Sequence, residues 1–265
     1  MHTSNVKRKL AAGQPVLAGK VNFGSPQEVE MMGLMGYDCV WICTEHLYAD
    51  ASRLDHLCCA ARAGHIDLML RRNMGSYRDL LQPLEMGVQG FMIPRVKDAA
   101  YLRHVVQMVK FPPEGDRGLD GVNADADFGL LPLEEYVARS NRETFLVAQI
   151  EDPEALDNLE EIASVDHVDV LFVGPGDLAL QFGIPGKIRD RRILEACDRV
   201  LDACRRHGKT AGTTTPNAED AKELMRMGFR FFGTGADYRF VKNGLLQTKQ
   251  SFSDIGFSFR ETLPH

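Results

Sequence analysis

The stretches Phe145-Leu-Val-Ala-Gln-Ile-Glu-Asp-Pro153 and Val168-Asp-Val-Leu-Phe-Val-Gly-Pro-Gly-Asp177 decide the fold that we predict for this chain. Each is a short, mostly apolar run that ends in a carboxylate and turn-forming residues, as a buried parallel strand does at the edge of its sheet. Glu151 and Asp177 are 26 residues apart, about one strand–helix repeat, so neighbouring strands would present them side by side. Gln149 shares a face with Glu151 because side chains alternate along a strand. A polar group on an apolar face is costly without partners, so these strand ends predict a functional site.

The chain on both sides repeats this strand-then-helix pattern. Apolar runs typical of strands fall at residues 16–22, 38–43, 66–70, 90–93, 145–150, 168–173, 210–214 and 230–233. Helical patterns follow them at residues 25–35, 51–63, 77–86, 99–110, 154–162, 191–207, 218–227 and 237–249. Eight such units predict an α/β protein with one domain over residues 1–265, a single (β/α)8 TIM barrel with a core at about residues 7–249 and a tail at 250–265. An open sheet would need a Gly-rich phosphate turn after the first strand, and none is present.

Two segments depart from the repeat. Residues 111–132 form a long irregular stretch, and loops of this length are usually functional. A further helix is predicted at residues 133–140, and the segment from Asp177 to Lys187 is predicted to be irregular.

Composition excludes several classes of function. Hydrophobic residues make up 44% of the chain, enough to bury a large core. The net charge is −6 and no dense Lys/Arg tract occurs, which argues against nucleic acid or an anionic membrane as the main partner. No signal-peptide pattern and no apolar run of about 18 residues is present, so we expect a cytoplasmic protein. The six cysteines include no CxxC pair and are typical of reduced, mostly buried thiols.

The predicted carboxyl ends of the strands gather polar side chains, and in a barrel these ends build the active site. Glu151 and Asp177, with no His or Cys beside them, favour a hard cation such as Mg²⁺ or Mn²⁺ and leave positions for water and an oxygen-rich substrate. The alternative is that both carboxylates only cap the helices that follow them. The other strand ends carry Glu45, His46, Arg71, Arg72, Arg95 and residues 213–215.

Several of these residues have more than one interpretation. His46 is either a general base, since imidazole titrates near neutral pH, or a hydrogen-bonded surface residue. The planar fork of Arg71 is suited to an enolate or carboxylate. Arg72 and Arg95 either add to the same anion site or form salt bridges. Gly212 and the glycines of residues 233–235 either cradle a phosphate or serve the turns that close the barrel.

Five motifs, in this order, resemble the HpcH/HpaI aldolase/citrate lyase family of the pyruvate/phosphoenolpyruvate barrel superfamily. They are Glu45-His46, Leu70-Arg71, Phe111-Pro-Pro-Glu-Gly-Asp-Arg-Gly118, Val147-Ala-Gln-Ile-Glu151 and Phe172-Val-Gly-Pro-Gly-Asp-Leu178. The likeness extends over nearly the whole chain, and the members that it resembles act on 2-dehydro-3-deoxyglucarate or 2,4-dihydroxyhept-2-ene-1,7-dioate. It implies a metal-dependent lyase, a class II pyruvate aldolase that reversibly cleaves a 4-hydroxy-2-oxo acid to pyruvate and an aldehyde through a metal-bound enolate.

The resemblance also implies roles for individual residues. Glu151 and Asp177 would hold the divalent cation, Mg²⁺ or Mn²⁺ with Co²⁺ as an alternative. Gln149 and the backbone at Gly176 and Asp177 would position pyruvate. Arg71 would stabilise the enolate oxygen, a role in which charge stabilisation acts only as the bond breaks.

In the same family, His46 would serve the proton transfers through a water. The resemblance further implies a homohexamer whose C-terminal helices are exchanged between subunits, with the loop at residues 115–127 reaching towards a neighbouring site. The substrate would be a small 2-oxo acid.

Three positions depart from the family pattern. Cys43 stands where an Asp that pairs with the His is frequent, Arg72 where Pro is frequent, and Arg95 where an apolar residue is usual. The first change bears on the base and the other two on the aldehyde end of the substrate. Two alternatives to an aldolase stay open, a decarboxylase of a 2-oxo diacid on the same barrel and a binding barrel without catalysis.

Overall fold

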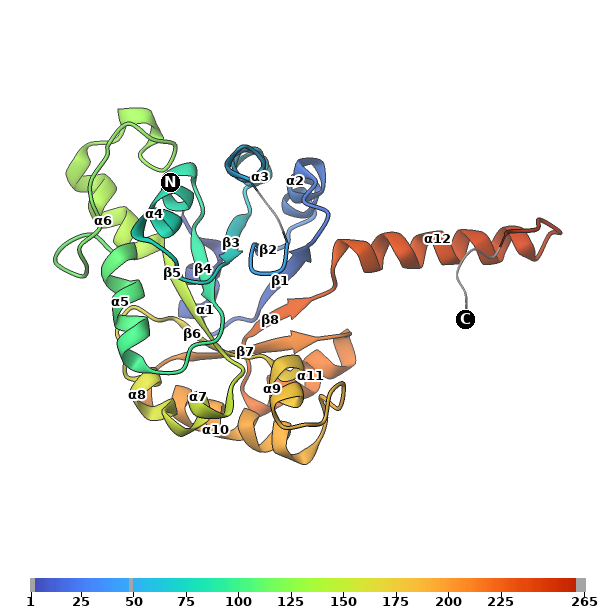
Figure 1. Cartoon of the computed structure of the whole chain (residues 1–265). Helices are drawn as coiled ribbons and strands as arrows, with labels where there is room; N and C mark the ends of the chain where they lie inside the picture. Colours follow the sequence, from blue (N-terminus) through green and yellow to red (C-terminus); the bar gives the residue numbers. More distant parts are fainter. Residues whose placement is uncertain (1–2, 48–49, 261–265) are drawn as a thin grey trace.

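The computed structural model describes residues 3–47 and 50–260, and its centre is a closed barrel of eight parallel strands (Figure 1). The strands are β1 Val16–Val21, β2 Cys39–Cys43, β3 Asp67–Arg71, β4 Gly90–Ile93, β5 Phe145–Ile150, β6 Val170–Val173, β7 Thr210–Thr215 and β8 Phe231–Thr234. They are ordered as in the sequence, and β8 pairs with β1 to close the sheet. The predicted (β/α)8 barrel is confirmed.

Helices cover the outside of the barrel, except that α12 projects away from it (Figure 1). The helices are α1 Asn5–Ala11, α2 Pro26–Leu34, α3 Ala51–Gly64, α4 Tyr77–Met86, α5 Ala99–Val109, η1 Asp127–Gly129, α6 Leu133–Glu143, α7 Pro153–Asp157, α8 Leu159–Ala163, α9 Pro175–Gln181, α10 Arg191–His207, α11 Ala218–Met227 and α12 Asp237–Ser253. No helix in the described part of the chain is long and apolar enough to span a membrane.

Two helix predictions were wrong. The segment at 154–162 is not one helix but two, α7 and α8, which meet at Asn158. The segment after β6 is not irregular throughout, because it begins with α9. Pro175 at the first helical position and Asp177 in the first turn are helix-start signals, and they outweigh the glycines beside them.

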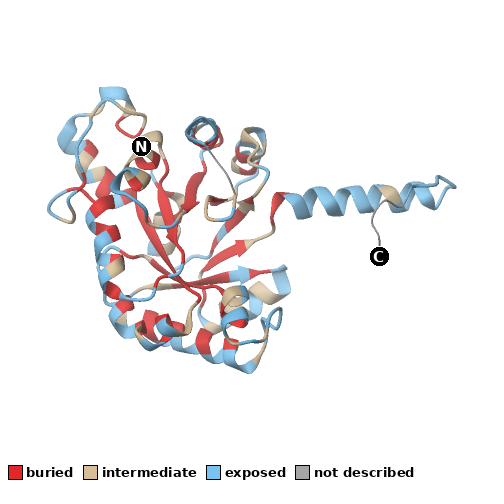
Figure 2. Cartoon of the chain, in the orientation of Figure 1, coloured by how far each residue is buried: buried red, intermediate tan, exposed pale blue. Residues whose placement is uncertain are grey.

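Side chains alternate between the barrel interior and the helical layer, so the strands are buried on both faces (Figure 2). The interior is filled by an apolar cluster that includes Val16, Ala18, Trp41, Met69, Met92, Phe145, Val147, Val170, Phe172 and Phe231. Helix α1, which was not predicted, lies at the amino-terminal end of the strands, where Asp67 accepts hydrogen bonds from the Ser4 hydroxyl and the Val6 amide. The opposite end of the barrel is left for the polar residues.

Trp41 lies at the boundary between the apolar interior and the polar end. Its ring packs edge-to-face on Phe172, with the ring centroids 5.8 Å apart. A Cβ at Gly233 would lie 3.0 Å from the Trp41 ring, so glycine in β8 permits this close approach. The indole ring therefore lies between the apolar interior and the charged side chains of the mouth, which lie over it.

Candidate active site

Glu151 follows the last residue of β5 and is held at two points. Only 4% of the residue is exposed. Its Oε1 accepts a hydrogen bond from the Arg95 amide at 2.8 Å, and its Oε2 accepts one from Gln149 Nε2 at 2.5 Å. Arg95 has a φ of 52°, a left-handed conformation that costs a non-glycine residue free energy and concentrates at functional sites. The carboxylate is therefore oriented before any ligand binds.

The end of β6 approaches this carboxylate closely because Gly174 has no side chain. A Cβ on Gly174 would lie 2.8 Å from Glu151 Cβ and 3.0 Å from Gln149 Nε2. Asp177 lies three residues further on, half-buried in the first turn of α9. The space beside Gly176 is open, since a Cβ there would meet no heavy atom within 4 Å.

Negative charge accumulates around Glu151. The pKa of its carboxyl group is raised to about 7, mainly by burial and also by the charges of Asp177 and Glu45, whereas the Arg95 amide and Arg71 oppose the shift. The prediction that neighbouring strands present Glu151 and Asp177 side by side agrees with this influence of Asp177 on Glu151.

The donor atoms fit a hard divalent cation. Gln149 Oε1 is buried and has no hydrogen-bond partner among the residues that the structure describes. A cation would offset the repulsion between the carboxylates and lies within the preference of oxygen ligands. Residues 3–47 and 50–260 contain no group of three or more His, Cys, Asp or Glu side chains arranged for a metal, so two carboxylates would leave coordination positions for water and substrate.

Arg71 is the last residue of β3, and its buried guanidinium is restrained on three sides. Its Nε lies 3.2 Å from Glu45 Oε2. Its Nε and Nη2 donate to Cys43 Sγ at 3.4 and 3.1 Å. Its Cζ lies 5.2 Å from the centroid of the Trp41 ring. A planar fork held in this way suits recognition of a carboxylate or enolate.

His46 is much less restrained. Its side chain is 63% exposed, and its Nε2 lies 3.6 Å from Glu45 Oε2. The thiol of Cys43 contacts Arg71, whereas the carboxylate next to His46 belongs to Glu45. Cys43 therefore does not occupy the place of an acid that orients His46.

The two remaining arginines differ from each other. Arg72 Nη2 forms a salt bridge of 2.6 Å with Asp79 in the first turn of α4, which agrees with the salt-bridge alternative. Arg95 reaches the site with its backbone amide, and its side chain is exposed. The sequence analysis considered only the side chain, and no pattern in the sequence marks such an amide.

The sequence analysis also missed Lys20. This residue lies in β1 two positions after Ala18, so it has the interior orientation of Val16 and Ala18. Its Nζ lies 5.0 Å from the centroid of the Trp41 ring. A lysine in phase with the buried residues of an apolar strand is the signal that would have identified it.

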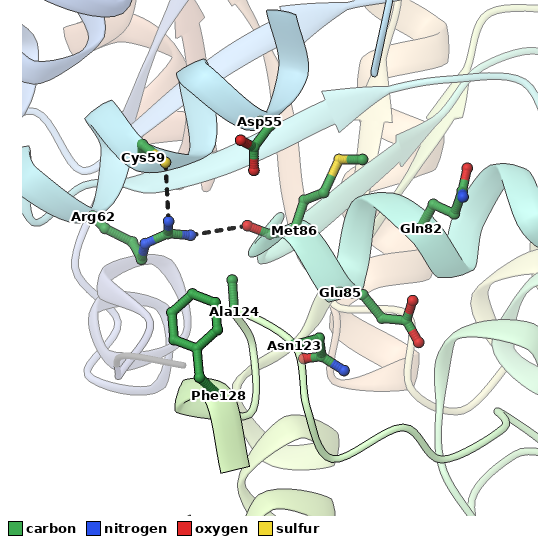
Figure 3. Close-up of a pocket in the computed structure, with 9 residues that line it drawn as sticks. All are labelled: Asp55, Cys59, Arg62, Gln82, Glu85, Met86, Asn123, Ala124 and Phe128. Carbon is green, nitrogen blue, oxygen red and sulfur yellow. Dashed lines mark hydrogen bonds between the residues drawn. The ribbon is translucent and has the colours of Figure 1, made fainter. Parts of the chain in front are cut away.

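One hollow of the surface lies away from the strand ends. It has a volume of about 400 Å³ and lies between α3, α4 and residues 123–128, where Arg62 donates to Cys59 Sγ and to the Met86 carbonyl (Figure 3). None of the predicted site residues lines it. A cavity of about 230 Å³ that includes Lys20 and Trp41 opens at the barrel mouth instead. Barrel enzymes use the mouth, so position outweighs size here.

The chain is similar to known proteins over most of its length. The family model described as HpcH/HpaI aldolase/citrate lyase matches residues 21–244. The chain is 28% identical to 5-keto-4-deoxy-D-glucarate aldolase of Klebsiella pneumoniae, over 93% of this chain and 95% of that protein. It is 30% identical to hydroxypyruvate/pyruvate aldolase of Roseovarius nubinhibens, again over 93% and 95%.

Solved structures agree over almost the whole chain. An HpcH/HpaI aldolase from Desulfitobacterium hafniense has a TM-score of 0.90 and 27% identity, covering 96% of this chain and 99% of that one. The citrate synthase SbnG has a TM-score of 0.83 and 29% identity, covering 94% and 98%.

Proposed function

The chain belongs to the HpcH/HpaI aldolase/citrate lyase family, as the sequence motifs predicted, and on that premise we propose that it is a divalent-metal-dependent aldolase. It would reversibly cleave a 4-hydroxy-2-oxo acid to pyruvate and an aldehyde. Relatives named as aldolases support a lyase activity. The observation that carries the finer proposal is the meeting of Glu151, Asp177 and Arg71 at the carboxyl ends of the strands.

Glu151 and Asp177 would hold the cation, Mg²⁺ or Mn²⁺ or alternatively Co²⁺. When bound, it would supply a Lewis acid for the 2-oxo carboxylate end of the substrate. Gln149 and the backbone at Gly176 and Asp177 would position pyruvate. The amide group of Gln149 is already oriented by its hydrogen bond to Glu151.

Arg71 would act on the charge that develops during bond cleavage. Loss of the proton from the substrate hydroxyl allows the C3–C4 electron pair to pass into the enolate of pyruvate, while C4 leaves as the aldehyde carbonyl. Protonation of the enolate methylene then yields pyruvate. The guanidinium is restrained by Cys43 and Glu45 before the reaction, so it would stabilise the enolate oxygen without reorganisation.

His46 would exchange protons with the substrate through a water. Its exposed ring is compatible with access to solvent, and its Nε2 lies 3.6 Å from the Glu45 carboxylate. In this assignment the base, His46, lies in the loop after β2. The guanidinium that would stabilise the enolate belongs to Arg71, the last residue of β3.

We also propose that the chain forms a homo-oligomer, a hexamer that exchanges α12 between subunits. Helix α12 extends from the barrel and is mostly exposed (Figure 2). Large apolar residues are among its exposed positions. They are Phe240, Val241, Leu245, Leu246 and Phe252, and Ile255, Phe257 and Phe259 continue the set. An apolar surface of this kind marks a protein contact.

Deuterium exchange at the methyl group of pyruvate tests the proposed function directly. We expect exchange that depends on added Mg²⁺, Mn²⁺ or Co²⁺ and aldol cleavage that is reversible. Absence of exchange with all three metals would contradict the proposal and leave the binding barrel as the interpretation. Decarboxylation of oxaloacetate faster than any aldol cleavage would identify the alternative lyase.

A further inference from the structure

We propose that the aldehyde half of the substrate carries a carboxylate or phosphate group, and that Lys20 and Arg239 bind this anion in a subsite beside the candidate active site. This inference rests on the proposed aldolase function, because it names the class of aldehyde that this site accepts. It goes beyond that function by assigning residues to the end of the substrate remote from pyruvate.

The first observation is a lysine without a counter-ion. Lys20 is half-buried at the mouth, and no described residue forms a salt bridge with it. Burial lowers the pKa of its ammonium group, and the charge of neighbouring Arg71 lowers it further. A desolvated cation beside other cations is unfavourable unless an anion joins it.

The second observation is the cavity that Lys20 lines. Its volume is about 230 Å³, and no Asp or Glu side chain lines it. Its lining includes Thr214 and Thr215 from the end of β7, Gly235 after β8, and Arg239 in the first turn of α12. Arg239 donates from Nε to the Tyr238 hydroxyl, and this contact leaves the two terminal nitrogens of the fork for a ligand. Hydroxyls and cations together form a recognition site for an oxyanion.

Trp41 provides a third, independent observation. It lines the same cavity and is 4% exposed, yet its Nε1–H has no hydrogen-bond partner among the residues that the structure describes. Buried donors are normally paired. The oxygens of an anionic group would supply the missing acceptor.

The nearest carboxylate along the chain does not neutralise this pocket. Asp237 is buried, and its Oδ2 accepts hydrogen bonds from the amides of Asn22 and Phe23 at 2.7 and 2.5 Å. Its charge is thus directed to the loop after β1. The lining of the cavity thus carries the two cations Lys20 and Arg239 and no carboxylate.

The subsite adjoins the pyruvate end of the site through a shared side chain. The Trp41 ring lies 5.2 Å from Arg71 Cζ and 5.0 Å from Lys20 Nζ. A short substrate would therefore place its oxo-acid end near Arg71 and a distal anion at Lys20. A neutral aldehyde would leave Lys20 and Arg239 without a counter-ion.

The first experiment compares aldehydes of matched length in the addition of pyruvate. We expect kcat/KM of the native enzyme to be at least about tenfold higher for glyoxylate or glycolaldehyde phosphate than for neutral glycolaldehyde, the range of one charge-assisted hydrogen bond. The better of the two anionic aldehydes distinguishes carboxylate from phosphate. Lys20→Met should lower kcat/KM for the anionic aldehydes about 10–100-fold, with a much smaller loss for glycolaldehyde. Lys20→Arg should retain the preference, and Arg239→Gln should reduce it.

Lys242→Met is the matched control, because Lys242 is exposed on α12 outside the cavity; it should behave as the native enzyme. A native enzyme that prefers glycolaldehyde, or a Lys20→Met variant that keeps the anionic preference, would overturn the proposal. So would trapping of pyruvate on Lys20 by borohydride, which would make Lys20 a nucleophile.

A binding measurement separates this inference from the proposed function. Trp41 is the single tryptophan of the chain, so its fluorescence reports on this cavity during titration with inorganic phosphate. We expect a saturable change that Lys20→Met weakens at least about tenfold and Lys242→Met does not. If pyruvate exchange is absent but this result holds, the aldolase proposal fails and the anion site stands. Equal phosphate binding by native protein and Lys20→Met would overturn the anion site.

Discussion

The two sides of the barrel mouth differ in how completely one chain builds them. On the β5–β6 side, Glu151 is almost fully buried and both carboxylate oxygens accept hydrogen bonds. On the β2 side, His46 is largely exposed, and its Nε2 lies 3.6 Å from the carboxylate of Glu45. A residue at a strand end is positioned by the sheet, whereas a residue in a following loop needs further contacts. The comparison predicts that substitutions on the first side have the larger effects.

Removal of a carboxylate on the β5–β6 side should have the largest effect. We expect Glu151→Gln and Asp177→Asn to weaken Mn²⁺ binding by more than about 100-fold, since even outer ligands of metals contribute 10–100-fold. Calorimetric titration with Mn²⁺ measures this, and circular dichroism checks that the fold is intact. Undiminished Mn²⁺ binding by both variants would refute the assignment of the metal ligands.

Substitution of Arg71 comes next, because it lies between the two sides. Lysine keeps the charge but lacks the planar fork that contacts Cys43 and Glu45. We expect Arg71→Lys to lower turnover by about 10²–10³, with a smaller change in KM for pyruvate. Steady-state kinetics decide this, and near-native turnover would contradict the enolate role.

Changes on the His46 side should be smaller. We expect His46→Ala to reduce pyruvate deuterium exchange by about 10²-fold or less, because the ring is exposed and acts through water. Cys43→Asp sharpens the contrast, since the new carboxylate would face Arg71 rather than His46. It should lower turnover and leave the pH midpoint of exchange unchanged. A midpoint that rises in Cys43→Asp would show that position 43 does act on His46.

The smallest effect is expected where α2 meets the start of α12. Burial and the charge of Asp237 raise the pKa of Glu28 to about 7. The folded protein therefore holds this proton more tightly than the unfolded chain, so the free energy of unfolding should decrease as pH rises from about 4.5 to 7. Glu28→Gln should remove this decrease, which is about 1 kcal/mol or less because the group is partly solvated. Urea unfolding at pH 5 and pH 8 measures it; an unchanged pH slope in the variant would contradict it.

Much of the fold was predictable because its signals are local. The bounds of α4, α10 and α11 were predicted as the structure has them, since each helix combines a strong period with a cap. Helix α9 was missed because glycines beside Pro175 suggested a turn, while the helix-start signals were given too little weight. Helix α1 was missed because seven residues provide little periodicity.

The sequence by itself determined the barrel and the residues at its strand ends, because strand alternation and strand–helix repeats depend on neighbours along the chain. The identification of Glu151, Asp177 and Arg71 as candidates required only that parallel strands end at one edge of the sheet. Tertiary structure alone decided that Cys43 contacts Arg71 and that the Arg95 amide donates a hydrogen bond to Glu151. It also decided that Lys20 and Arg71 both lie over the Trp41 ring. These contacts join residues that lie on or directly after different strands. Their geometry depends on the register and closure of the barrel, which no local pattern encodes.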